Sequence, residues 1–463
     1  MRTAYSVETV RAAERELMAR LPEGTLMRRA AAGLAASCAG LLRRVYGARI
    51  VLLVGPGDNG GDALYAGARL ARRGAGVTAV PMDPGRMHPG GLAALLGAGG
   101  RVASAVPGRA DLVVDGLLGI GGRGGLRPAA AALVERIPPG AVVVAADLPS
   151  GVDADTGEVV GAAVRADVTV TFGAYKPGLL IDPGASRAGA VRLVDIGLTL
   201  PAPDAQALQH ADVAGLLPEP GAASDKYRRG VVGIVAGSAR YPGAAVLAVA
   251  GALRGGAGAV RYVGPAAVGE AVLARYPETL IGRGRVQAWV VGPGLGDERR
   301  AQVLEDPVPV LVDADGLRGL DPQALRARTA PTLLTPHAGE AAALLGVGRE
   351  EVEAGRLASV RALAQRYGAT VLLKGSTTLV CDGTAPVRVN PTGTPWLATA
   401  GSGDVLSGLA GSLLAAGLSG PDAASVAAYL HGLAARRAAS GAPLHAHEVA
   451  EALPAAWRDV RTP

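Results

Sequence analysis

The stretch that decides the fold of the first half of the chain is Arg49-Ile-Val-Leu-Leu-Val-Gly-Pro-Gly-Asp-Asn-Gly-Gly-Asp62. Its apolar run predicts a buried strand, and the glycines after it predict a tight turn that leads into a helix. Such a turn lets the backbone approach a ligand, and a helix N-terminus favours an anion. Asp58 and Asp62 would repel a bound phosphate, however, so we expect these carboxylates to hold a cation or to move a proton.

Short β-branched runs alternate with Ala- and Leu-rich helical patterns around this stretch. The alternation predicts an α/β fold, in which a parallel sheet carries helices on both faces. The predicted strands of the first half are residues 49–54, 77–80, 112–115, 142–146, 168–172 and 190–194. Helices are predicted over residues 62–73 and 128–136. Ligands bind such sheets at the carboxyl ends of the strands, where the glycine-rich turn also lies.

A second α/β series follows the proline-containing stretch Leu200-Pro-Ala-Pro-Asp-Ala-Gln206, which we interpret as a linker. Its predicted strands are residues 231–236, 259–263, 289–292, 308–312, 332–334, 370–373 and 378–381. The two series share no order of motifs. At 463 residues the chain is long for one domain. We therefore predict two unlike domains, over residues 1–206 and 212–463.

The composition limits the classes of partner. A net charge of +6 allows nucleic acid as a partner, but aromatic residues make up only 3% of the chain and no block of five basic residues occurs. We therefore expect small-molecule substrates and no nucleic acid. The sequence has no signal-like start and no long uncharged apolar stretch, so we expect a cytoplasmic protein without membrane contact. Cys38 and Cys381 are expected to be buried free thiols, and we also expect a homo-oligomer.

Only three lysines occur in the chain, Lys176, Lys226 and Lys374. Arginine provides the general surface cation, so a retained lysine indicates a place where a compact ammonium is needed. Survival of a few lysines by chance is the alternative. The Gly- and Pro-rich surroundings of these lysines mildly favour a functional role.

Two further aspartate-containing loops follow predicted strands of the first half. They are Asp115-Gly-Leu-Leu-Gly-Ile-Gly-Gly-Arg-Gly-Gly125 and Asp147-Leu-Pro-Ser-Gly-Val-Asp153. Carboxylate, amide and hydroxyl oxygens suit an alkali or alkaline-earth ion. Aspartate and glycine are also common turn formers, which is the simpler interpretation of each loop taken alone. The Gly55–Gly60 stretch also satisfies G-x-G-x-x-G with Asp83 as the following acid, so a Rossmann oxidoreductase stays open.

These loops, together with Leu26-Met-Arg-Arg-Ala-Ala31 and Thr171-Phe-Gly-Ala-Tyr-Lys-Pro-Gly178, resemble the NAD(P)H-hydrate epimerase domain, which has a Rossmann-like three-layer α/β/α fold. The resemblance implies a potassium ion at Asn59, Asp115 and Ser150. Asp147 is the candidate acid/base. The residues that the resemblance assigns to the hydrated nicotinamide nucleotide are Asp58, Asn59, Gly60, Gly61, Asp62, Gly119, Ile120, Gly121, Gly122, Arg123, Gly124, Gly125 and Asp147. The chain departs from the family at Asp58 and Ala63, where asparagine and glycine are usual.

Gly401-Ser-Gly-Asp404 begins an apolar stretch in the second half. Backbone N–H groups at a helix start stabilise a transferring phosphate, and a carboxylate beside it can act as a base toward an alcohol. The alternative is a simple helix start in which Ser402 caps the helix and Asp404 is an acid in the first turn. From these four residues alone, both interpretations stand.

Other motifs of the second half occur in the order typical of one family. Arg254-Gly-Gly-Ala-Gly258, Gly292-Pro-Gly-Leu-Gly296, Asp313-Ala-Asp-Gly316, Thr335-Pro-His-Ala-Gly-Glu340, Leu373-Lys-Gly375 and the Gly401–Leu406 stretch resemble the ribokinase-like ADP/ATP-dependent NAD(P)H-hydrate dehydratase. The resemblance assigns the hydrated substrate to Ala257, Gly294, His337 and Asp404. It assigns ADP (AMP after the reaction) to Lys374, Gly375, Ser376, Thr377, Thr378 and Gly403. Magnesium would accompany ADP, with Glu340 as a helper, and Asp404 would be the catalytic base.

The leading prediction is a bifunctional enzyme that repairs hydrated NADH and NADPH. Its first domain would interconvert the two epimers of the hydrate, and its second would use ADP to dehydrate the usable epimer, releasing AMP and phosphate. One alternative is a vitamin or sugar kinase of the ribokinase-like class fused to a non-catalytic Rossmann-like module. A nicotinamide-dependent dehydrogenase fits less well, because the carboxylates in the first loop oppose a bound pyrophosphate.

Overall fold

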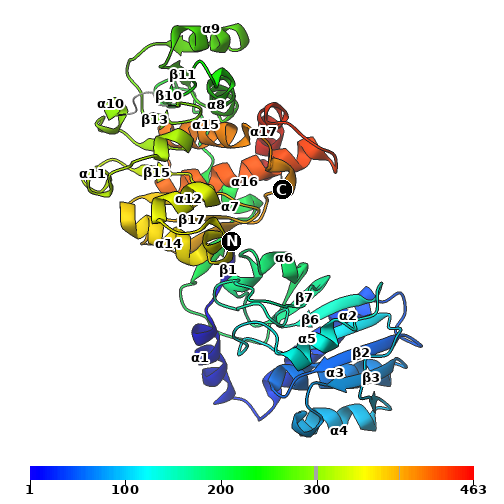
Figure 1. The fold of residues 1–463 in the computed structure, drawn as a ribbon. Coiled ribbons are helices and arrows are strands. Elements are labelled where there is room, and N and C mark those ends of the chain that lie inside the picture. The colour runs from blue at the N-terminus through cyan, green and yellow to red at the C-terminus, as the bar shows by residue number, and fades with distance from the viewer. Residues whose placement is uncertain (297–300, 385, 463) are drawn as a thin grey trace. The chain divides into compact units, whose positions relative to one another are not determined.

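The computed structural model describes residues 1–296, 301–384 and 386–462. The chain forms two compact units: residues 3–204 make up the first, and residues 205–463 with residues 1–2 make up the second. Figure 1 shows a sheet with flanking helices in each. No helix in the described ranges is both long and apolar enough to cross a membrane.

The first unit is built on a parallel seven-stranded sheet with the order β4-β3-β2-β5-β6-β7-β8. Its strands are β2 (Arg49–Val54), β3 (Gly76–Pro81), β4 (Arg101–Val102), β5 (Leu112–Gly116), β6 (Val142–Ala146), β7 (Val168–Phe172) and β8 (Ala190–Val194). From β2 the chain runs outward to β4, returns to the other side of β2 at β5, and continues to β8. The strand order therefore reverses between β2 and β5, and a crevice for ligands forms at such a point.

Helices cover both faces of this sheet because successive residues of β2 point to opposite sides. Leu52 packs with α2 (Thr25–Leu41) and α3 (Asp58–Arg72), whereas Leu53 packs with α5 (Pro128–Val134). The remaining helices of the unit are α1 (Val7–Met18), η1 (Pro84–Arg86), α4 (Pro89–Gly97), η2 (Pro177–Leu179) and α6 (Ala185–Ala188). The predicted three-layer α/β/α arrangement is confirmed.

The second unit contains a mixed eleven-stranded sheet with the order β1-β9-β18-β17-β16-β15-β14-β13-β10-β11-β12. The strands from β12 to β16 run parallel, and β17 is antiparallel to β16 and β18. The bounds are β1 (Arg2–Ala4), β9 (Ala205–Ala207), β10 (Val231–Val235), β11 (Ala259–Tyr262), β12 (Leu280–Ile281), β13 (Ala288–Val291), β14 (Val310–Val312), β15 (Thr332–Leu334), β16 (Thr370–Leu373), β17 (Thr378–Cys381) and β18 (Val387–Asn390). Here the strand order reverses between β10 and β13.

Two glycines bring α8 (Pro242–Arg254) and α15 (Ser402–Ala415) into backbone contact. A Cβ on Gly251 would lie 2.1 Å from the Val405 carbonyl oxygen, and one on Gly408 would lie 1.9 Å from the Ala248 carbonyl oxygen. Any larger residue would push the helices apart, so these glycines fix where α15 begins.

The other helices of the second unit surround this pair and the sheet. They are α7 (His210–Leu216), α9 (Ala266–Arg275), α10 (Ala301–Leu304), η3 (Ala314–Leu317), α11 (Pro322–Arg326), α12 (Ala338–Leu345), α13 (Arg349–Ala354), α14 (Arg356–Tyr367), η4 (Pro395–Leu397), α16 (Gly420–Ala439) and α17 (Ala446–Arg461). Helices α8, α15, α16 and α17 share one apolar core with alternate residues of the central strands. That core holds the start of α15 in place.

Every strand predicted from the sequence is present, with ends that differ by no more than two residues. Strands β1, β4, β9, β12 and β18 were not predicted, because they are short and carry little alternation. The linker prediction is too long by two residues, since Ala205 already belongs to β9 and pairs with Val387 of β18. Cys38 and Cys381 are buried free thiols, as predicted, and burial raises the pKa of Cys38 to about 12.

The largest correction concerns the first glycine-rich stretch. The predicted helix of residues 62–73 begins at Asp58 instead, with Gly57 as the N-cap, so the site residues from Asp58 to Asp62 lie in its first turns. A Cβ on Gly60 would lie 2.2 Å from the Gly55 carbonyl oxygen. The glycines therefore pack the helix start against the turn before it, and do not form an extended loop.

Two candidate active sites

Asp147 lies directly after β6 and has a φ of 65°, a left-handed conformation that residues other than glycine rarely adopt. Its carboxylate accepts hydrogen bonds from Lys176 Nζ at 2.5 Å, Thr171 Oγ1 at 3.1 Å and the Phe172 N–H at 3.3 Å. Lys176 is 1% exposed and also donates to Thr171 Oγ1 and the Phe172 carbonyl. The fold thus holds Asp147 in a strained backbone conformation, with its carboxylate hydrogen-bonded to the buried ammonium of Lys176.

Three more carboxyl groups surround this ion pair. Asp62 is 8% exposed, and burial together with the charges of Asp147, Asp58 and Glu14 raises its pKa well above the usual value. Burial also raises the pKa of Glu14 on α1, against the opposing charge of Lys176. Asp58 is exposed in the first turn of α3. Lys176 and Glu14 were not among the predicted site residues, although the rarity of lysine had marked Lys176.

The three residues predicted to hold potassium lie together. Asp115 is fully buried, and its carboxylate accepts from Ser150 N at 2.8 Å and Ser150 Oγ at 2.7 Å. Burial raises the pKa of Asp115 to about 6 despite these hydrogen bonds. Asn59 Nδ2 donates to the Leu118 carbonyl, which also accepts from Ser150 Oγ, whereas the buried Asn59 Oδ1 has no hydrogen-bond partner among the described residues. That amide oxygen is open to a ligand.

The predicted substrate loop, Gly119 to Gly125, follows β5 and lies beside this cluster. A Cβ on Gly119 would lie 3.3 Å from Asn59 Cβ, and one on Gly121 would lie 3.0 Å from an Arg11 guanidinium nitrogen. Ile120 and Gly122 are half-buried, whereas Arg123 and Gly124 at the tip are exposed. The loop therefore presents backbone groups and one guanidinium at the switch point of the first sheet.

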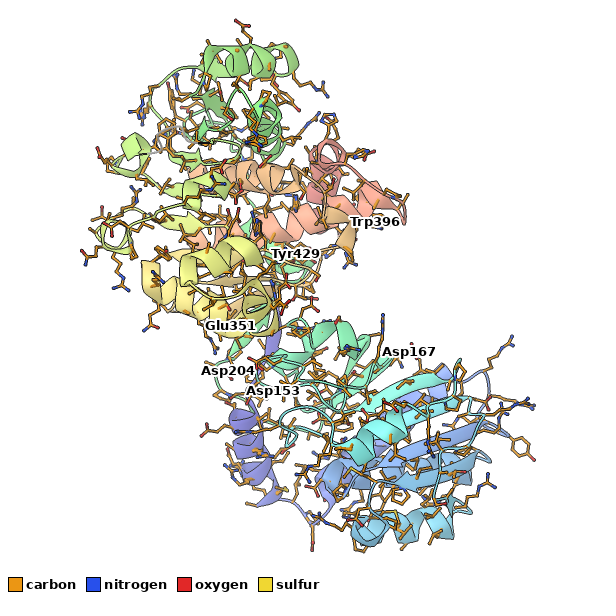
Figure 2. All side chains as sticks on the ribbon, viewed as in Figure 1. Asp153, Asp167, Asp204, Glu351, Trp396 and Tyr429 are labelled. Carbon is orange, nitrogen blue, oxygen red and sulfur yellow. The ribbon has the colours of Figure 1, made fainter. Side chains whose placement is uncertain are left out.

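The loop after Asp147 is held by its own aspartate, Asp153, which is labelled in Figure 2. The Asp153 carboxylate accepts from the N–H groups of Asp155 and Thr156, each at 3.0 Å. Asp204, also labelled there, accepts from Ser6 N at the start of α1. These contacts order the segments that carry Asp147 and Glu14.

The second site lies where neighbouring parallel strands of the second sheet end in register. Val291, Val312 and Leu334 are in register across β13, β14 and β15. The residues that follow these strands, with those after β16, therefore meet at one edge of the sheet. Asp313 follows β14, and Lys374 follows β16.

Lys374 lies at the centre of a group of carboxylates at this edge. Its Nζ donates to Asp313 Oδ1 at 2.8 Å and lies 3.8 Å from Glu340 Oε2. Asp313 is 1% exposed and also accepts from Ser407 Oγ of α15 at 2.7 Å. Burial alone would lower the pKa of Lys374, but the charges of Asp313, Glu340 and Asp404 outweigh it and raise that pKa.

Asp404 lies in the first turn of α15, next to this group. Burial, and then the charge of Asp313, raise the pKa of Asp404 to about 7, although Lys374 acts in the opposite direction. Gly403 lies against the lysine, since a Cβ there would be 3.4 Å from Lys374 Nζ. The interpretation of Ser402 as the N-cap is wrong: Gly401 is the N-cap, and Ser402 Oγ donates to the Leu397 carbonyl.

The predicted nucleotide residues, Lys374 to Thr378, form the turn between β16 and β17. Gly375 and Ser376 are exposed, whereas Thr377 and Thr378 are buried. The buried Arg356 guanidinium donates to the carbonyls of Leu373, Lys374 and Thr377. These hydrogen bonds fix the conformation of the turn. We did not predict Arg356, because a single arginine in a helical pattern carries no signal of its own.

His337 and Glu340 form a capping box at the start of α12. His337 Nδ1 accepts from Glu340 N, and a Glu340 carboxylate oxygen accepts from His337 N. The His337 side chain is 59% exposed at the same edge as Lys374, so its ring faces solvent beside the site. Its capping role explains the spacing of these two residues without any ligand.

The structure contradicts the placement of Ala257 in this site. Ala257 precedes β11, whose amino end lies beside that of β10, and the adjacent Gly255 carbonyl accepts from Ser412 Oγ. Ser412 is ten residues beyond Ser402 in α15, or about 15 Å along the helix. Ala244 is better placed, because a Cβ on the left-handed Gly294 would lie 2.6 Å from Ala244 Cβ.

Two family models match the chain. The model described as NAD(P)H-hydrate dehydratase covers residues 232–455, and that of the YjeF-related protein N-terminus covers residues 23–178. The bifunctional NAD(P)H-hydrate repair enzyme Nnr of Mycobacterium leprae is 49% identical over 457 residues, covering 95% of each chain. The enzyme of the same name from Mycobacterium tuberculosis is 48% identical over 442 residues, covering 92% of each chain.

Solved structures resemble the second unit. The ADP/ATP-dependent NAD(P)H-hydrate dehydratase of Bacillus subtilis, co-crystallised with ATP/Mg²⁺, matches 54% of this chain and 97% of its own, with 30% identity and a TM-score of 0.50. A ribokinase-like superfamily protein of Enterococcus faecalis matches 57% of this chain and 99% of its own, with 22% identity and a TM-score of 0.50. The predicted ribokinase-like fold is confirmed, and the chain belongs to the family of bifunctional NAD(P)H-hydrate repair enzymes.

Proposed function

We propose that this chain repairs hydrated NADH and NADPH through two reactions at two separate sites. The observation that carries the proposal is that each sheet edge holds a carboxylate next to a lysine. In the first unit Asp147 forms an ion pair with Lys176, and in the second Asp404 lies beside Lys374. The first site would epimerise the hydrate, and the second would dehydrate one epimer at the expense of a nucleotide. Membership of the repair-enzyme family supports this pair of reactions over a dehydrogenase or a vitamin kinase.

Epimerisation inverts the carbon that bears a hydroxyl group next to the ring nitrogen. Reversible opening or loss at that carbon requires a proton to leave and to return, so a positioned acid/base is needed. We assign this role to Asp147, because its left-handed backbone and buried lysine partner fix its carboxylate at the carboxyl end of β6, next to β5. The surrounding residues from Asp58 to Asp62 and from Gly119 to Gly125 would bind the substrate.

We also propose that Asn59, Asp115 and Ser150 hold a potassium ion. The donors present suit a hard monovalent cation, because they are oxygens and the buried Asn59 Oδ1 has no hydrogen-bond partner. A bound cation would fix the two loops around the substrate, and would take no part in bond breaking.

Replacing potassium with choline at constant ionic strength is expected to slow epimerisation about 10-fold or more, since loss of an ordering ion disturbs the substrate loops. Chromatographic separation of the two epimers without ADP measures the rate. An Asn59→Ala variant should be slow in both salts. Equal rates for the unmodified chain in potassium and choline would contradict the potassium assignment.

At the second site we propose phosphorylation followed by elimination. Hydroxide is a poor leaving group, whereas a phosphate ester is a good one. Asp404 would take the proton of the ring hydroxyl as its oxygen bonds to the terminal phosphorus of ADP and AMP departs. The ring nitrogen would then expel phosphate to give a C=N bond, and loss of a proton from the adjacent ring carbon to solvent would restore the dihydropyridine.

The residues around Asp404 would position the two substrates. Residues 374–378 and Gly403 would hold the nucleotide, and Gly294 with His337 would hold the hydrate, with Ala244 in place of Ala257. Magnesium would neutralise the negative charge of the phosphates. Glu340 lies near Lys374 and would help to hold the magnesium ion. We further propose a homo-oligomer in the cytoplasm, with AMP and phosphate as by-products.

The full chain is expected to restore dihydronicotinamide absorbance to hydrated NADH only when ADP or ATP is added. The nucleotide supplies the phosphoryl group without which hydroxide would have to leave. Absorbance and chromatography of both epimers, with and without ADP, test the proposal. Restoration without nucleotide would contradict the phosphorylation scheme, and a stoichiometric phosphorylated product without NADH would favour the kinase alternative.

A further inference from the structure

Asp62 carries a buried carboxyl oxygen that no described residue satisfies. Asp62 Oδ1 has no hydrogen-bond partner, and the residue is 8% exposed. Asp115 in the same unit is also buried, but it accepts hydrogen bonds from Ser150 N, Ser150 Oγ and Leu117 N. Both Asp115 carboxylate oxygens thus have donors, whereas Asp62 Oδ1 lacks the donor that a buried carboxylate oxygen requires.

The charges that act on Asp62 are acidic. They are Glu14 of α1, Asp58 on the same helix and Asp147 after β6, and the ring of His88 lies against the adjacent Gly61. Lys176 is hydrogen-bonded to Asp147 and two further acceptors. Its ammonium is therefore bound to Asp147, and Asp62, on α3, is near enough for the charge of Asp147 to act on it.

Burial beside other carboxylates favours the protonated form of a carboxyl group in this position and raises its pKa. An ionised Asp62 would be a buried charge beside Asp147, Asp58 and Glu14 with no donor on its Oδ1. As a neutral acid it has an O–H group to donate. The site thus contains two carboxyl groups in different surroundings. Asp147, which is paired with a lysine, is suited to act as a base, and Asp62, which has no such partner, is suited to act as an acid.

We propose, on the basis of the epimerase function proposed above, that Asp62 is the proton donor of the first site and acts together with Asp147. Asp62 protonates the ring hydroxyl, the C–O bond breaks as the nitrogen lone pair forms a C=N bond, and water leaves. Water then adds to the opposite face of that carbon, its proton passes to Asp147, and the electron pair returns to nitrogen. Asp62 is then ionised and Asp147 protonated, and transfer of that proton from Asp147 to Asp62 through water restores both groups, so the reaction needs no other reactant.

Asp62→Asn in the full chain tests the proposal. The amide keeps the size of the side chain but cannot give up a proton as an acid does, so we expect kcat for epimerisation to fall about 100-fold. In the unmodified chain kcat should decrease at high pH as Asp62 loses its proton, and this decrease should be absent from Asp62→Asn. Asp62→Glu should restore part of the rate together with the decrease at high pH. Epimers are separated chromatographically without ADP from pH 5 to 9.

The matched control is Asp58→Asn, which makes the same change of charge and size four residues earlier and should alter KM while keeping the decrease of kcat at high pH. An Asp62→Asn enzyme that keeps its rate, or loses rate with an unchanged pH profile, would overturn the assignment. If Asp62→Asn fails to fold, an Asp62→Glu enzyme whose kcat does not decrease at high pH would overturn it. An unmodified chain that does not epimerise at all would instead overturn the proposed function on which this inference rests.

Discussion

Replacing Asp404 with asparagine is expected to lower ADP-dependent dehydration about 10³-fold while epimerisation by the same chain continues unchanged. Asparagine keeps the shape of the first turn of α15 but cannot accept the proton of the ring hydroxyl. The two activities lie in separate compact units, so the epimerase provides an internal control. The measurement is the initial rate of NADH recovery from the usable epimer at saturating ADP.

The pH dependence of the same reaction follows from the environment of Asp404. A base must be ionised, and burial with the charge of Asp313 raises the pKa of Asp404 to about 7. The dehydration rate should therefore fall as the pH drops below about 7, whereas an aspartate of ordinary pKa would stay active down to about pH 4. Asp321→Asn, which changes an exposed N-cap of α11, should leave both rate and profile unchanged. An active Asp404→Asn enzyme would show that Asp404 is not the base.

Replacing Asp147 with alanine is expected to abolish epimerisation, by 10³-fold or more, and to leave ADP-dependent dehydration of the usable epimer intact. The variant removes the carboxylate that takes and returns the proton. It also leaves the Lys176 ammonium buried without its ionic partner, which costs about 3–5 kcal/mol. Epimer interconversion without ADP measures the first effect, and thermal unfolding measures the second.

A double variant separates catalysis from stability at this position. Asp147→Asn with Lys176→Met removes both charges and keeps the volume, so it should recover most of the lost stability but none of the epimerase activity. Asp147→Asn alone should be less stable than the double variant. Epimerisation by either variant at the rate of the unmodified chain would remove Asp147 from the catalytic role.

Local pattern was sufficient for the strands and for the strand-end loops. Residues 50–54 are apolar throughout, so a continuous apolar run followed by glycines identifies β2 as a buried strand with its turn. Residues 142–146 are likewise apolar throughout, whereas residues 168–171 alternate valine with threonine. The helix start at Asp58 could not be predicted in this way, because glycine normally weakens a helix and only the contact of Gly60 with Gly55 explains it.

The proximity of candidate site residues was predictable where a motif ends a strand, and not where the fold brings distant residues together. Asn59, Asp115 and Ser150 lie at or just after the ends of neighbouring strands and close to one another. Ala257 was misplaced because its motif lies at the amino end of β11, and sequence order does not reveal which end of a strand faces the site. Arg356 was missed because its three acceptors lie 17 to 21 residues away.

By itself the sequence determined that this chain is an α/β protein of two unlike series, and that carboxylates end its strands, because strand period and glycine turns are local properties. Only the tertiary structure decided the surroundings of those carboxylates. Lys176 binds Asp147 across 29 residues of chain, and Asp313 with Lys374 lies beside Asp404 from other strands. Charge and burial act through space, so the proton affinity of an aspartate depends on the side chains that the fold places beside it.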